Sequence, residues 1–141
     1  MMTTVMDRGM MLGGLLLVAS AGSTLGQAPA ARPASDSITP AMIARGDSVF
    51  HGKIGGGTCY VCHGQDAKGT QGLAPDLTAG KWLNGDGSFG FIVNTVQKGV
   101  PNPKESPAAM PPMGGANLAA DQVRAVAAYV YSLSRSKTHK D

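Results

Sequence analysis

Apolar positions separated by three and four residues mark the first ordered stretch of this chain, which follows Thr39. Thr39 offers a capping hydroxyl, and Pro40 is suited to the first position of a helix, where a missing N–H loses no bond. The apolar face consists of Ile43, Gly46, Val49 and Phe50. The pattern predicts a helix that begins at Pro40 and ends before Gly52.

Two more helices are predicted in the second half of the chain. Ser88 can cap a helix that Gly99 and Pro101 bring to an end, and its apolar members are Phe89, Ile92, Val93 and Val96. The last helix is expected from about Ala119 to Ser134. Its stripe at positions i, i+3, i+4 and i+7 is made by Val123, Val126, Ala127, Val130 and Leu133.

The segments between these helices have the composition of loops. Glycines 55–57 precede a short helical turn expected at 59–63, residues 64–80 read as a loop, and a second brief helical turn is expected at Lys81–Leu83. A proline-rich loop follows from Pro101 to Gly115. No segment alternates as a strand does and no repeat is visible, so the sequence predicts a small all-α domain.

The chemistry is concentrated in residues 59–63, Cys-Tyr-Val-Cys-His, which contain both cysteines of the chain. This is the attachment motif of a c-type haem. Cys59 and Cys62 would form thioether bonds to the two vinyl groups, and His63 would ligate the iron through a neutral imidazole nitrogen. The motif therefore predicts one covalently attached haem c.

Three other interpretations of the cysteine pair are weaker. A structural zinc site needs four ligands, and outside the motif the chain offers only His51 and His139. A thioredoxin-like pair needs a strand and a helix around it, whereas glycines flank this one. A disulfide between Cys59 and Cys62 would close too small a loop to constrain the chain much.

Residues 1–21 are predicted to direct export. Arg8, the apolar stretch 10–18 and Ala19-Ser20-Ala21 have the order of a secretory signal peptide, residues 1–21, with Gly26/Gln27 as a second possible junction. An uncleaved anchor is the alternative, although the apolar run is short for a membrane span. Residues 22–37 then form a flexible Ala/Pro/Ser leader, 38–136 the folded domain, and 137–141 a disordered tail. Export and haem attachment together predict a periplasmic protein without a membrane span in its mature part.

Charge and aromatic content narrow the function further. The net charge is +3, with 12 basic and 9 acidic side chains, and no basic run is interleaved with aromatic residues. This pattern does not favour nucleic-acid binding. The chain has only seven aromatic residues, so a buried haem would supply much of the apolar area that a domain of about 100 residues needs.

From about Pro40 to Ser134, the chain resembles the class I bacterial cytochromes c, small single-haem electron carriers. Three stretches carry the resemblance: Cys59 to Gly64, Met110-Pro-Pro-Met113-Gly-Gly, and Val123-Arg-Ala-Val-Ala-Ala-Tyr129-Val within the last helix. The second stretch is similar to the loop that brings the sixth iron ligand in that family. The resemblance implies a fold of about four helices around one haem, with His63 and a methionine as axial ligands.

The methionine ligand is one of two residues. Outside the N-terminal segment only Met42, Met110 and Met113 occur, and Met42 lies on the apolar face of a predicted helix. In the family the methionine directly before proline is the usual ligand, which points to Met110, with Met113 as the alternative.

The resemblance implies further roles. Pro75 would accept the proton of the ligand histidine with its carbonyl, and Trp82 would pack on the haem. Gly46, Phe50 and Tyr129 would form the crossing of the terminal helices. Ala119 stands where related chains often have Ser or Thr, so no cap paired with Gln122 is expected.

These features predict an electron carrier rather than an enzyme: a periplasmic protein, expected to be a monomer, that docks transiently on a redox donor and a redox acceptor. Two alternatives stay open. One is a haem c subunit bound tightly to a dehydrogenase or oxidase complex. The other is a haem sensor or peroxidase-like protein whose methionine leaves the iron.

Overall fold

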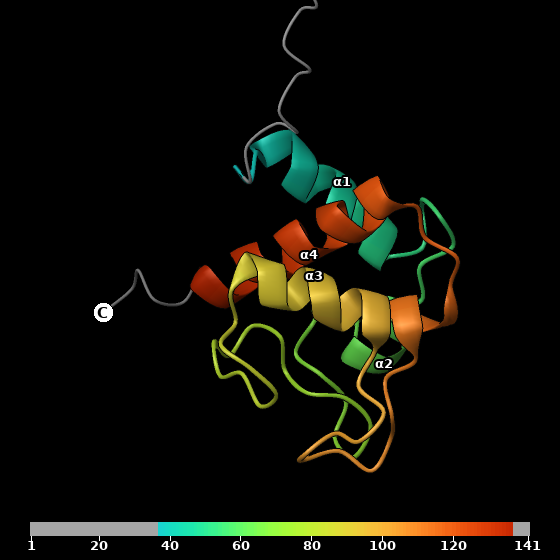
Figure 1. Cartoon of the computed structure of the whole chain (residues 1–141), viewed down its shortest axis with the longest axis vertical. Coiled ribbons are helices and arrows are strands. Elements are labelled where there is room, and N and C mark those ends of the chain that lie inside the picture. Colours follow the sequence, from blue (N-terminus) through green and yellow to red (C-terminus); the bar gives the residue numbers. More distant parts are fainter. Residues whose placement is uncertain (1–36, 137–141) are drawn as a thin grey trace, which may run out of the picture. The chain divides into compact units, whose positions relative to one another are not determined.

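The computed structural model describes residues 37–136, in which every regular element is helical (Figure 1). The elements are α1 (Pro40–Phe50), α2 (Cys59–His63), α3 (Phe89–Lys98), the 3-10 turn η1 (Pro112–Gly115) and α4 (Ala120–Arg135). Strand-like pairing in this part is limited to two isolated bridges, Thr70 with Ala74 and Val100 with Met110. The predicted all-α fold with four α-helices is confirmed. The predicted signal peptide, leader and tail lie outside the described residues, apart from Ser37 at the leader's end.

Helix α1 begins and ends where its pattern predicts. The Thr39 hydroxyl accepts a hydrogen bond of 3.2 Å from the Met42 N–H, and Pro40 occupies the first turn. Gly52 follows the helix with φ +74°, a backbone conformation that side chains with a Cβ rarely adopt. Gly46, Val49 and Phe50 are its buried residues.

Helix α1 crosses α4, and a glycine makes the close approach possible (Figure 1). A Cβ placed on Gly46 would overlap the backbone carbonyl of Ala125 and would lie 2.8 Å from the Cβ of Tyr129. Beside this contact the rings of Phe50 and Tyr129 pack with their centroids 5.4 Å apart. The predicted crossing of the terminal helices is therefore present, and the two helices form the back wall of the core.

Helix α3 packs alongside α4 with Ile92 and Val96 buried (Figure 1). The Ser88 hydroxyl caps it by accepting from the Phe91 N–H at 3.1 Å. The helical turn expected at Lys81–Leu83 is wrong, because these residues have no helical conformation. Three residues between glycine-containing bends are too few to repay the nucleation of a helical turn.

The start of α4 corrects a second expectation. The Ala119 N–H donates to Oε1 of Gln122 at 2.8 Å, so the glutamine half of a capping box forms even though alanine contributes no hydroxyl. Asp121, in the first turn of α4, forms an exposed ion pair with Arg45 of α1 at 2.6 Å. No helix among residues 37–136 is long and apolar enough to cross a membrane.

Candidate functional site

A cavity lies among α2, α3, α4 and two loops, and it is lined mainly by apolar side chains. The wall combines residues from α1, α2, α3, α4 and the loops at 73–84 and 100–114. The residues predicted to hold haem all contribute to it: Cys59, Cys62, His63, Pro75, Trp82 and Met110. The fold therefore brings to one place side chains that are up to 51 positions apart in the sequence.

His63 ends α2 and is held in a fixed orientation. It is 9% exposed, and its Nδ1 lies 3.0 Å from the carbonyl oxygen of Pro75. Since a carbonyl only accepts, Nδ1 carries the proton and Nε2 keeps a free lone pair. Burial lowers the pKa of His63, which favours the neutral ring that a metal ion requires. This is the contact that the resemblance implies for Pro75.

The two cysteines sit on the short α2 helix, one at each side of an exposed residue. Both are free thiols of intermediate burial, and burial raises the pKa of the Cys59 thiol. Val61 between them is 58% exposed. The attachment motif therefore contributes Cys59, Cys62 and His63 to the cavity wall, while Val61 between the cysteines faces solvent.

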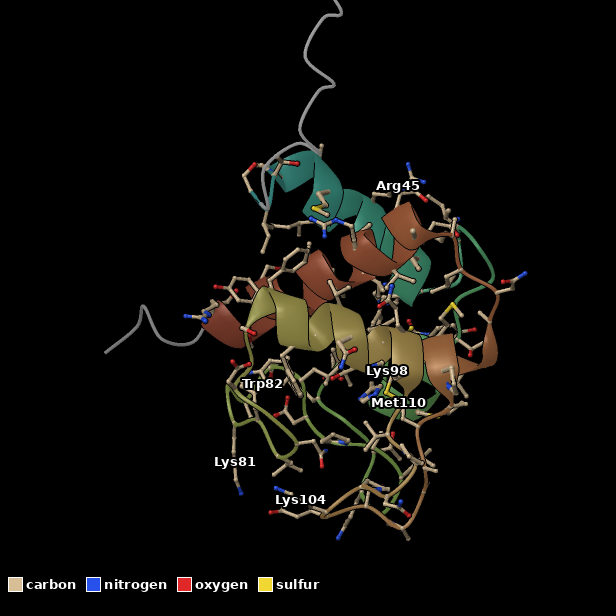
Figure 2. All side chains as sticks on the ribbon, in the orientation of Figure 1. Arg45, Lys81, Trp82, Lys98, Lys104 and Met110 are labelled. Carbon is tan, nitrogen blue, oxygen red and sulfur yellow. The ribbon has the colours of Figure 1, made fainter. Side chains whose placement is uncertain are left out.

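Met110 and Met113 occupy different environments. Met110 lines the cavity and is paired with Val100 through two backbone bonds, of 2.8 and 3.0 Å. Figure 2 shows Met110 on the side of α3 where α2 lies. Met113 is not among the cavity residues and packs against the core cluster instead. Of the two alternatives, Met110 contributes to the cavity wall and Met113 does not, and the choice of ligand between them stays a prediction.

Trp82 contributes to the cavity wall from the irregular loop that precedes α3. Its ring meets that of Phe91 edge-on, with centroids 6.2 Å apart, and Gly87 lies directly against the indole. Phe91 was missed by the sequence analysis. The run Phe89-Gly-Phe91-Ile92-Val93 is apolar on more than one face of α3, which is the pattern of a helix buried on two sides.

His51 lies outside the cavity, as its position at the end of α1 suggested. Its Nδ1 is 2.9 Å from the carbonyl of Asp47 and its Nε2 is 2.9 Å from the carbonyl of Gln65. The bond to Gln65 is the main reason why the pKa of His51 is raised. Among the described residues, no three His, Cys, Asp or Glu side chains gather as a metal site. His139 lies outside the described residues.

The donor set fits the haem that the motif predicts. Two thiols, an imidazole with its second nitrogen already bonded, and a thioether line one apolar cavity. Such a combination matches the covalent and axial bonds of a haem c with histidine and methionine ligands. The assignment of His63 and Met110 as ligands stays a prediction.

Comparison with known proteins identifies related chains. The family model described as cytochrome C oxidase, cbb3-type, subunit III matches residues 41–130. The cbb3-type cytochrome c oxidase subunit CcoP of Rubrivivax gelatinosus is 38% identical over 96 residues, which are 67% of this chain and 27% of that protein. CcoP of Rhodobacter capsulatus is 42% identical over 76 residues, 53% of this chain and 25% of that protein.

The subunit FixP of Rhizobium meliloti is 34% identical over 95 residues, 67% of this chain and 28% of FixP. This chain thus spans only about a quarter of the length of the curated relatives that it matches. No solved structure matches it significantly.

Proposed function

The chain belongs to the cytochrome c oxidase, cbb3-type, subunit III family, and from this premise we propose that it transfers single electrons as a haem c subunit of an oxidase complex. The observation that carries the proposal is the cavity where Cys59, Cys62, His63 and Met110 meet. A bound haem c would supply the one-electron Fe(III)/Fe(II) couple. The chain is an electron-transfer component and not itself the catalyst.

The protein's own residues would set how this couple behaves. The Pro75 carbonyl holds the His63 ring in place through Nδ1, and the backbone pairing with Val100 fixes the chain at Met110. Two axial side chains would leave the iron no position for a substrate. A thioether ligand and an apolar wall both favour the reduced iron and raise its potential. Rigid ligands also keep the reorganisation that accompanies electron transfer small.

Electrons would enter and leave at the rim of the cavity. Cys59 and Cys62, which would hold the haem, are only partly buried, and Val61 between them is 58% exposed, so a docked partner could contact the protein next to the attachment site. One attachment motif supports a single haem. The first expectation, a freely diffusing carrier, has less support than its alternative, because the relatives named above are oxidase subunits.

We place the protein in the periplasm on the strength of the predicted export segment. Tagged full-length chain isolated from its native host should migrate with oxidase subunits on native gels and should be protected from proteases until the outer envelope is opened. Recovery as a single chain in the soluble periplasmic fraction would instead favour the hypothesis of a freely diffusing electron carrier.

The ligand assignment is tested by the visible spectrum of the exported, haem-loaded protein, recorded oxidised, reduced, and reduced under carbon monoxide. Wild type should be low-spin and indifferent to carbon monoxide, whereas Met110→Ala should bind it readily. Met113→Ala is the matched control and should behave as wild type. A wild type that binds carbon monoxide at once would mean an open iron position and would favour a sensor or a peroxidase-like enzyme.

A further inference from the structure

The segment that carries Met110 contains a backbone conformation that needs external support. Met113, in η1, has φ 54° and ψ 24°, and Gly114 follows with φ 66°. The left-handed region is natural for glycine but costs a residue with a Cβ about 1 kcal/mol or more. Such a conformation persists only where contacts on both sides of it hold the chain.

One of these contacts lies on the Met110 side. Met110 and Val100 exchange two backbone hydrogen bonds, which tie the start of the segment to the end of α3. Gly99 lies so close that a Cβ there would be 2.8 Å from the Pro111 carbonyl carbon.

The other contact lies on the far side and comes from Thr58. Its hydroxyl donates to the carbonyl oxygen of Gly114 at 2.8 Å, across 56 positions of sequence. Thr58 stands directly before Cys59, and its neighbour's Sγ lies 3.9 Å from where a Cβ of Gly114 would be. The bond thus joins the methionine segment to the helix that carries both cysteines and His63.

The position of Thr58 makes this bond informative. A threonine at the N-cap of a helix ordinarily accepts a bond from an N–H of the first turn. Thr58 occupies that position for α2 but makes no capping bond there. Its hydroxyl interacts with the methionine segment instead of its own helix.

We propose that Thr58 is a positioning residue that holds the Met110 segment against the haem-attachment helix and so keeps the thioether on the iron. The inference rests on the proposed function, because it presumes ligation by Met110. Loss of the hydroxyl would let the segment from Pro111 to Gly114 open more often without loosening the Val100 pairing. Displacement of the methionine by an added ligand would then become easier.

The experiment measures how imidazole displaces methionine from the ferric, haem-loaded full-length protein, followed by loss of the weak long-wavelength band of methionine-ligated haem. Thr58→Val keeps the shape and removes the donor, and it should raise the apparent affinity for imidazole about fivefold, the factor expected for one hydrogen bond. Thr58→Ser restores a hydroxyl and should return the affinity to within about twofold of wild type.

Thr39→Val is the matched control, since it removes a hydroxyl bond of 3.2 Å at the start of α1. It should lower the urea midpoint and leave the affinity for imidazole unchanged. Equal affinities for wild type and Thr58→Val, or the same rise in Thr39→Val, would overturn the inference while leaving the proposed function intact. A wild type without the methionine band would overturn the proposed function itself, and this inference with it.

Discussion

Replacing Gly46 by alanine tests whether the crossing of α1 and α4 depends on the absence of a side chain. The new Cβ would overlap the Ala125 carbonyl and lie 2.8 Å from the Cβ of Tyr129, whereas ordinary contacts are 3.4–4 Å. The obstacle is backbone, which cannot rotate away as a side chain can. The two helices would have to separate, and the ring contact between Phe50 and Tyr129 would loosen.

The size of the effect follows from two opposing terms. Adding a methyl group to a well-packed core costs about 1–3 kcal/mol, and a backbone clash belongs at the upper end. Alanine in place of glycine within a helix stabilises the folded protein by about 1 kcal/mol. We therefore expect Gly46→Ala to lower the free energy of unfolding by about 2 kcal/mol.

Gly90 provides a matched control. It is an exposed glycine inside α3, and a Cβ placed there would meet nothing within 4 Å. Gly90→Ala should therefore gain about 0.5–1 kcal/mol from helix propensity alone. The difference of about 3 kcal/mol between the unfolding free energies of the two variants measures the cost of packing a methyl group at Gly46.

The assay is urea unfolding of the haem-loaded protein, followed by far-ultraviolet circular dichroism. At a slope of about 1.5 kcal/mol/M, a loss of 2 kcal/mol lowers the midpoint by about 1.3 M. Equal gains in stability for Gly46→Ala and Gly90→Ala would refute the argument that close approach at Gly46 organises the crossing.

Two further predictions concern hydrogen bonds outside the cavity. The bonds of His51 to the carbonyls of Asp47 and Gln65 require both ring nitrogens to be protonated, and the pKa of His51 is accordingly raised in the folded protein. Its stabilising effect should be complete below the unfolded pKa of about 6.5 and lost as pH rises through the folded value. The difference in urea midpoint between wild type and His51→Gln should therefore shrink from about pH 5 to about pH 9, and a constant difference would contradict this origin. Gln122→Ala leaves the Ala119 N–H without its acceptor and should cost about 0.5–1 kcal/mol in urea unfolding. The same change at exposed Gln97 of α3 is the control, and an equal loss there would argue against the capping role.

The helices were predictable because their causes are local. Thr39 and Ser88 cap the two helices that their sequence positions indicate. In α4 the stripe residues Val123, Val126, Ala127 and Val130 are buried as their spacing requires, whereas Leu133 near the end of the helix is only half-buried. The haem-attachment motif was also predictable, because its five residues are adjacent in the chain. At Lys81–Leu83 the local helix preference was too weak to form a helical turn, and these residues lie in an irregular loop in which Trp82 packs edge-on against Phe91.

Other features depend on residues that meet only in the folded chain. Nothing in the sequence pairs Thr58 with Gly114 or His51 with Gln65, because no periodicity connects positions so far apart. The choice between Met110 and Met113 is of the same kind: both are loop methionines near prolines, and it takes the folded chain to show that Met110 lines the cavity and Met113 does not. Gln122 shows that half of a capping box forms without its hydroxyl partner.

The pairing of Val100 with Met110 also anchors the backbone of Met110 independently of the length of the loop that joins the two residues. Residues 101–109 form a loop whose two ends are closed by backbone bonds, so the position of Met110 is set at the base of the loop and not by its length. Doubling the length of a flexible loop costs only about 0.6 kcal/mol. Pro103 and Glu105, on either side of exposed Lys104 (Figure 2), line the cavity, so an insertion between them would leave the backbone at Met110 in place but would change this part of the cavity wall.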